Sequence, residues 1–270
     1  MGQPSDVPHY DLEPPEVAVD PREKPMGFLE HLEELRWTLV KSAIAFVVFA
    51  ALIGIFLKEF NHVLLWPLHY VQANRPEFTL DLGTTSIMEG FTVVLQMCFM
   101  GGLVMAGPFI LYFIGQFVAP ALHDRELKLL LPGCIAAFVL FLIGAAFSFF
   151  LLTPSTIRVS LELNDLLGFT QRWTPGNYYG LLTWLVLGVG VAFQFPLVVM
   201  LLVYLDIVTV KKLRSWRRHA IIVFFVIAAI VTPTPDPFTQ TALALPLYGL
   251  YELAMLASSR IEKRRAMEAF

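Results

Sequence analysis

The segment EHLEELRWTLVKSAIAFVVFA, residues 30–50, joins an acidic amphipathic helical turn directly to a long apolar run. A hydrocarbon layer about 30 Å thick is crossed by about 20 apolar residues at a rise of about 1.5 Å each. The apolar run from Trp37 to Leu57 meets this length. The segment therefore predicts a helix that crosses a membrane and carries carboxylates at its membrane border.

The whole chain has the composition of an integral membrane protein. Its 270 residues are 57% hydrophobic and 15% charged, with a mean hydropathy of +0.67. This leaves too little polar surface to coat a soluble globule of the same size. Cys98 and Cys134 lie inside apolar runs, where cysteine usually acts as a small hydrophobic residue. Residues 1–27 lack the apolar core of a signal peptide and are rich in proline and acids, which predicts a disordered cytoplasmic tail.

Six apolar runs predict an all-α integral membrane protein with six transmembrane helices in a membrane domain of residues 28–258, followed by a basic tail of residues 259–270. The runs are about 37–57, 91–113, 129–152, 178–204, 219–231 and 241–257. The last two are short, and only the proline-rich turn TPTPDPFTQ separates them, so we interpret them as a helical hairpin. A run of about 13 apolar residues is also compatible with a buried or re-entrant segment.

Basic residues gather on one predicted side of the membrane. That side receives Arg22, Lys24, Arg36, Lys41, Arg125, Lys128, Lys211, Lys212, Arg214, Arg217, Arg218, Arg260, Lys263, Arg264 and Arg265. The other side keeps Lys58, Arg75, Arg158 and Arg172. Loops rich in lysine and arginine stay in the cytoplasm, so both termini are expected to be cytoplasmic.

Polar groups inside predicted spans are costly and therefore informative. Gln96 and Gln194 are equally compatible with hydrogen bonds between helices, worth about 1 kcal/mol, and with a role in substrate passage. Glu252 lies close enough to Arg260 to reach the cytoplasmic interface, but we favour a functional or subunit-contact position. No catalytic or phosphate-binding motif is found, so we expect no enzyme activity, cofactor or metal.

Acidic residues gather at the predicted cytoplasmic border. His31, Glu34 and Leu35 share one helix face by their spacing. Asp124 and Glu126, in the loop after the second span, are expected at the same depth as Glu34. Glu126 is equally compatible with a structural role, because a carboxylate at a helix N-terminus gains about 0.3–1 kcal/mol from the helix dipole.

Four motifs, at their expected depths, resemble the TatC family. They are HLEELR (31–36), FVAPALHDRE (117–126), FQFP (193–196) and TPTPDPFTQ (232–240). TatC is the six-span core and signal-receptor subunit of the twin-arginine protein translocase, and the resemblance runs from about Phe28 to Arg260.

The resemblance implies a receptor site for the signal peptides of folded precursor proteins. The matching positions are His31, Glu34, Leu35, Arg36, Phe117, Pro120, Leu122 and Glu126. In the family, the acids at Glu34 and Glu126 help to recognise paired arginines, whose fork of donors suits a carboxylate. Glu30 and Glu33 are then expected to be merely solvated. The resemblance further implies transport across the cytoplasmic (inner) membrane, driven by the proton-motive force.

TatA-type and TatB-type single-span proteins are the implied partners in a multimeric complex, docked on the last two spans. Pro67, Asp236 and Gln240 also match family positions. Gln194 stands where many members carry a buried glutamate, and glutamine cannot ionise. The alternative function is an ion-coupled secondary transporter with a polar path through spans two, four and six, which predicts an inverted repeat that the sequence does not show.

Overall fold

The computed structural model describes residues 28–75, 82–119, 130–169, 172–205, 207–233 and 236–268. Its elements are α1 (Phe28–Ile55), α2 (Leu57–Leu64), α3 (Trp66–Asn74), α4 (Glu89–Val118), α6 (Leu130–Phe147), the π-helical turn η2 (Ser148–Leu152), α7 (Thr153–Leu167), α8 (Pro175–Ala192), α9 (Phe195–Tyr204), α10 (Val210–Ser215), α11 (Arg217–Val231) and α12 (Pro237–Glu268). In this part of the chain the fold is all-α, with one isolated β-bridge between Leu82 and Trp173.

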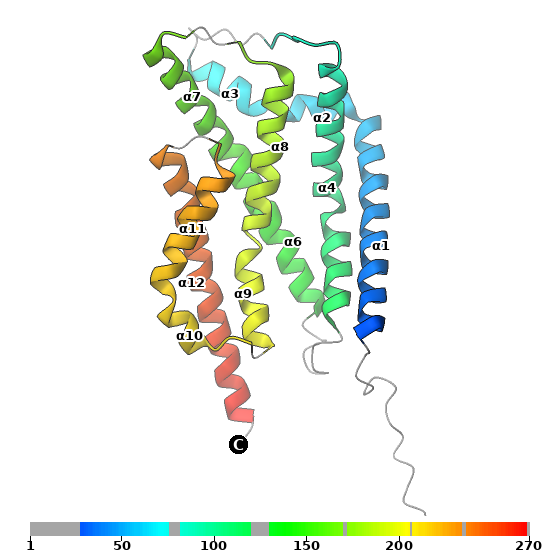
Figure 1. The fold of residues 1–270 in the computed structure, drawn as a ribbon, viewed down its shortest axis with the longest axis vertical. Coiled ribbons are helices and arrows are strands. Elements are labelled where there is room, and N and C mark those ends of the chain that lie inside the picture. Colours follow the sequence, from blue (N-terminus) through cyan, green and yellow to red (C-terminus); the bar gives the residue numbers. More distant parts are fainter. Residues whose placement is uncertain are drawn as a thin grey trace, which may run out of the picture.

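The long helices form a bundle in which successive passes alternate in direction (Figure 1). Five stretches are long and apolar enough to span a membrane: α1, α4, α6 through α7, α8 through α9, and α12. The shorter α11 runs beside α12 and supplies the remaining pass (Figure 1). We call the end of the bundle where α1 begins and α12 ends the proximal end, and the opposite end, where α2 and α3 lie, the distal end.

The third pass continues well beyond its apolar run. The chain is helical from Leu130 through η2 and α7 to Leu167, where Gly168, at φ +71°, ends the helix in the left-handed conformation. At the junction the hydroxyl of Thr153 donates to the carbonyl of Ser148 at 3.0 Å, and Pro154 follows at the start of α7. A π turn accommodates a residue without an amide donor, so the helix passes this proline unbroken.

Two short helices, α2 and α3, cover the distal end of the bundle. Pro67 is buried at the start of α3, a position that tolerates proline because the first helical amides have no partner within the helix. The Arg75 guanidinium ties the end of α3 to Glu162 of α7 at 2.8 Å. The buried Tyr178 hydroxyl donates to the Leu64 carbonyl of α2 at 2.6 Å. These contacts fix the distal helices on the bundle.

The last two helices differ in length. α11 has 15 residues, as expected of a short span, whereas α12 has 32. The expectation that both are short is therefore wrong for α12, because this helix begins before its apolar run at Pro237 and continues through the basic segment as far as Glu268. Helix formation does not require an apolar side chain, so an apolar run sets the length of the span and not that of the helix.

The core is divided into two apolar clusters that meet at α8. Leu185 and Val189 of α8 pack with α9, α10, α11 and α12, while Leu182 and Val186 pack with α2, α3, α4 and α7. α1 stands at the edge of the bundle and packs mainly on α4, where a Cβ on Gly102 would come within 2.9 Å of Ala50. Close approach of the two backbones at a glycine is a common form of helix packing in membranes.

Candidate functional site

A groove opens at the proximal end between α1, the end of α4 and the start of α6. Its volume is about 640 Å³. The lining residues are Glu30, Glu33, Glu34, Trp37, Thr38, Lys41, Gln116, Phe117, Ala119 and Leu130. Three carboxylates against one lysine give the groove a negative lining, so it suits a cationic ligand.

One carboxylate oxygen in this groove is left without a hydrogen bond. Glu34 Oε2 is shielded from solvent and accepts no hydrogen bond from the residues that the structure describes. The nearest basic atom that the structure gives it is His31 Nδ1, at 3.8 Å, which is too long for a hydrogen bond. A shielded acceptor without a donor is costly, and the cost is relieved when a ligand brings the donor. Glu34 is therefore prepared to accept from an incoming donor.

The side chain of His31 is held by a contact between helices. Its ring stacks on Phe117 at the end of α4, with the ring centroids 4.4 Å apart and the planes 16° from parallel. This stack joins the beginning of α1 to the end of α4, although the two residues are far apart in the chain. Leu35 and Arg36 are exposed on the same turn of α1, but neither lines the groove.

The remaining predicted receptor residues lie outside the described part of the chain. Pro120, Leu122 and Glu126 belong to residues 120–129, which the structure does not describe. The described residues on either side of that segment, Ala119 and Leu130, both line the groove. The segment that carries Glu126 thus leaves and rejoins the described structure at the groove wall.

Sequence reasoning set aside two acids that the structure places in the groove. Glu30 and Glu33 were expected to be merely solvated, but both line the groove beside Glu34. Consecutive turns of α1 bring the three acids there, since residues three and four apart share a face. Residues 30–34 are dense in acids and contain no lysine or arginine, but this pattern alone does not distinguish a groove from a solvated helix face.

The polar side chains inside the spans contribute to helix packing. The Gln194 amide, at the break between α8 and α9, donates to the Ala137 carbonyl of α6 at 2.8 Å. The Gln96 amide packs on Gly180 of α8, while its carbonyl oxygen is buried and has no hydrogen-bond partner in the described part of the chain. Both of these glutamines therefore make contacts between helices.

The hairpin of α11 and α12 is tied at its distal end by two of the predicted residues. Asp236 caps α12, since its carboxylate accepts from the Thr239 amide at 2.7 Å and from the Thr239 hydroxyl at 2.5 Å. The Gln240 amide donates to the Phe225 carbonyl of α11 at 3.1 Å. Both residues hold the turn between the two helices.

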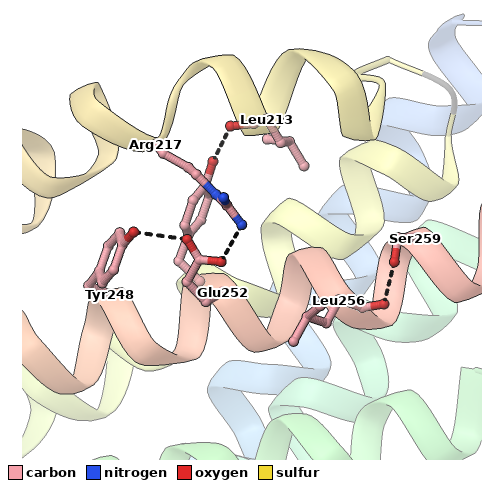
Figure 2. A network of polar contacts seen from close by, with 7 residues as sticks. Leu213, Arg217, Tyr248, Glu252, Leu256 and Ser259 are labelled. Carbon is pink, nitrogen blue, oxygen red and sulfur yellow. Dashed lines mark hydrogen bonds and ion pairs between the residues drawn. The ribbon is translucent and has the colours of Figure 1, made fainter.

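Glu252 ties the same hairpin nearer its proximal end (Figure 2). Its two oxygens accept from the Arg217 guanidinium at 2.7 Å and from the Tyr248 hydroxyl at 2.9 Å. The Tyr251 hydroxyl donates to the Leu213 carbonyl of α10 at 2.8 Å, beside this network. The carboxylate predicted inside the sixth span is therefore paired with a base at the start of α11.

The described residues contain no group of three or more histidine, cysteine, aspartate or glutamate side chains that could hold a metal ion. The proximal groove instead combines a negatively charged lining with an apolar wall. Trp37 and Phe117 supply that wall, and the carboxylates supply acceptors for cationic donors.

The family model and the relatives that match this chain all belong to one protein family. The family "Sec-independent protein translocase protein (TatC)" matches residues 30–246. A TatC protein of Aquifex aeolicus is 32% identical over 245 residues, which cover 89% of this chain and 98% of that protein. A TatC protein of Akkermansia muciniphila is 35% identical over 178 residues, which cover 66% of this chain and about half (51%) of that longer relative.

A solved structure shares the fold. The crystal structure of a twin-arginine translocase receptor, TatC, in DDM superposes with a TM-score of 0.72. The two sequences are 32% identical, and the match covers 85% of this chain and 99% of the solved one.

Proposed function

Because the chain belongs to the TatC family of Sec-independent protein translocases, we propose that its proximal groove recognises the twin-arginine signal peptides of folded precursor proteins. The chain is a multi-pass membrane protein of a translocase family. In the proposal, the proximal end faces the cytoplasm and the chain lies in the cytoplasmic (inner) membrane. The concentration of lysine and arginine in the segments of that end supports this orientation.

The observation that carries the proposal is the free acceptor on Glu34. An arginine presents a planar fork of donors that a carboxylate can accept at two points. Glu34 offers an oxygen without a hydrogen bond in a groove that two further carboxylates make negative. Glu126 belongs to residues 120–129, and the described residues on either side of them, Ala119 and Leu130, line the groove. Glu126 is proposed as the acceptor for the second arginine. His31, Leu35, Arg36, Phe117, Pro120 and Leu122 complete the proposed receptor site.

Transport is proposed to need the single-span partners, of TatA and TatB type, at the edge formed by α11 and α12. A hollow of about 200 Å³ lies between these helices, lined by Ile221, Phe224, Phe225, Thr241, Ala244, Leu245 and Tyr248. On α11, Ile222 and Ile230 are 63% and 65% exposed, so an apolar helix can pack against this edge.

The short α11 adds a physical reason for a partner at this edge. Its 15 residues extend over about 22 Å, against a hydrocarbon thickness of about 30 Å. A mismatch of this size is relieved by thinning of the bilayer or by association with another short helix. Recruitment of partners and local thinning of the bilayer are therefore proposed for the same edge.

The proposal assigns no chemical reaction to the chain. The proton-motive force would supply the work, at about 2.3 kcal/mol per elementary charge per 100 mV. The alternative of an ion-coupled carrier gains no support, since Gln194 and Glu252 from its expected path are bonded within the chain.

Photo-crosslinking of a signal peptide in membranes tests the receptor site. Replacing Glu34 and Glu126 with glutamine keeps the size of both side chains and removes the charge. A charge-assisted hydrogen bond contributes about 1.5–3 kcal/mol, so we expect each replacement to weaken binding about 10- to 100-fold. Insertion into the membrane should be unchanged.

Two controls separate charge from recognition. Glu59→Gln removes an exposed acid from α2 at the distal end and should leave binding unchanged. A signal peptide with two lysines in place of the arginines keeps the charge but lacks the fork, and it should bind the unaltered chain poorly. Undiminished crosslinking in the Glu34→Gln, Glu126→Gln double variant would show that these acids are structural only.

A further inference from the structure

The distal end of the bundle carries a half-buried arginine that has no acid partner among the described residues. Arg158 of α7 lies with its guanidinium carbon 5.4 Å from the centre of the Tyr70 ring. Among the residues that the structure describes, no acid pairs with it and no acceptor takes a hydrogen bond from it. The acid one turn further along α7, Glu162, is engaged by Arg75. The donors of Arg158 are therefore available to an external acceptor.

The surface beside Arg158 is aromatic and exposed. Trp66 stacks on Tyr70, with the ring centroids 5.1 Å apart, and meets Phe150 edge-on at 4.9 Å. Trp66, Tyr70 and Phe150 are 38%, 43% and 55% exposed. Leu151, which follows Phe150 in the chain, is 50% exposed. We call Trp66, Tyr70, Phe150, Leu151 and Arg158 the distal aromatic patch.

The position of the patch along the bundle corresponds to the membrane interface. Arg158 lies 28 residues after Leu130, the first residue of α6, along the continuous helix of the third pass. At about 1.5 Å per residue, it stands about 42 Å along the helix axis, or about 32 Å above Leu130 for a helix tilted by about 40°. With Leu130 at the opposite border of the hydrocarbon layer, both heights exceed its thickness of about 30 Å and place Arg158 at the level of the lipid headgroups.

From this arrangement we infer that the distal aromatic patch binds the phosphate of an anionic phospholipid. The guanidinium supplies a fork of donors that suits a phosphate, and Tyr70 beneath it holds the plane of the fork. Tryptophan and tyrosine favour the interface, where their apolar part contacts acyl chains and their polar edge reaches the headgroup. Phe150 and Leu151 provide the apolar surface for the acyl chains, which a free phosphate ion would not use.

Native mass spectrometry of the full chain tests this inference. The chain is titrated in detergent with dioleoyl-phosphatidylglycerol or dioleoyl-phosphatidylcholine. We expect one phosphatidylglycerol to bind at least tenfold more tightly than phosphatidylcholine. The Arg158→Gln variant should lose this preference, whereas Arg158→Lys should keep part of it, since a lysine retains the charge without the fork.

The matched control is Lys58→Gln, which removes an exposed base from α2 at the same end but outside the patch. It should change the preference for phosphatidylglycerol less than twofold. Equal losses in the Arg158→Gln and Lys58→Gln variants would overturn the inference, because the effect would then be one of net charge. Displacement of the lipid by 10 mM inorganic phosphate would also overturn it, in favour of a free-anion site. The comparison of the two lipids on the unaltered chain needs no variant, and the absence of a preference there would refute the inference even if Arg158→Gln failed to fold.

Discussion

Replacing Gly102 with alanine tests whether the close approach of α1 and α4 shapes the proximal groove. A Cβ at this position would lie 2.9 Å from the backbone nitrogen, the Cα and the Cβ of Ala50 on α1. Because these atoms belong to or adjoin the backbone, no side-chain rotation can make room. The two helices must move apart. Gly102 lies about 22 Å along α4 from Phe117, at about 1.5 Å per residue, so Glu34 and Phe117 on opposite walls of the groove separate as well only where α1 and α4 move as rigid bodies.

The size of the effect follows from the contact distance. Carbon atoms in contact lie about 3.5–4.0 Å apart, so the helices must separate locally by about 0.6–1.1 Å. Overpacking of this kind costs about 1–3 kcal/mol. Replacing a glycine inside a helix with alanine by itself stabilises the folded state by about 0.5–1 kcal/mol. Taken at the middle of each range, the net destabilisation is about 1.2 kcal/mol, which corresponds to a fall in Tm of about 2–5 °C for a chain of this size.

Thermal unfolding in detergent, together with signal-peptide binding, measures both consequences. The control is Gly133→Ala on α6, where a Cβ would meet nothing within 4 Å. That variant should have an unchanged or slightly raised Tm and normal binding. Gly102→Ala should have a lower Tm and weaker binding. If the two variants have the same Tm, the close approach of α1 and α4 does not constrain the bundle, and the reasoning fails.

Two further predictions concern bonds that tie the bundle together. Tyr178→Phe leaves a buried carbonyl of α2 without its donor and should lower the free energy of unfolding by about 1–3 kcal/mol, measured by thermal or denaturant unfolding; an unchanged stability would show that the carbonyl finds another donor. Glu252→Gln and Arg217→Gln should each lower the free energy of unfolding. The double variant should lose less free energy of unfolding than the two single losses added together, and the difference, the coupling energy of the pair, should be about 0.5–1.5 kcal/mol. Additive losses would contradict a direct interaction between the two charges.

The sequence predicted the membrane helices well because their apolar runs are long, and it missed helical structure whose stability depends on packing. Residues 153–167 carry too many polar side chains for a span, so the third helix was expected to end near residue 152. In the structure, Ile157 and Leu161 of α7 are buried against the distal helices. Their spacing of four residues and the following Gly168 were the local signals of an amphipathic helix with a glycine cap.

The candidate site was predictable along one helix and not between helices. The spacing of His31 and Glu34 placed them on one face of a helix, and the structure brings their side chains within 3.8 Å. The stack of His31 on Phe117 joins residues more than 80 positions apart, which no local pattern specifies. Without the end of α4 as the opposite wall, nothing in the sequence could show that Glu30 and Glu33 line a groove rather than face solvent.

Gln194 shows how the middle of the bundle differs from its ends. Its amide nitrogen donates to the Ala137 carbonyl of α6, while its backbone carbonyl accepts from the Leu197 and Val198 amides at the start of α9. An ionised glutamate at this place could not donate and would turn a negative charge toward a carbonyl oxygen. The position therefore fastens the break between α8 and α9 to a neighbouring helix with a neutral group. A mechanism that titrates a proton here is unavailable to this chain. The carboxylate that has no hydrogen bond from the described residues is Glu34 at the proximal groove, where the proposed recognition of a cationic ligand would use it.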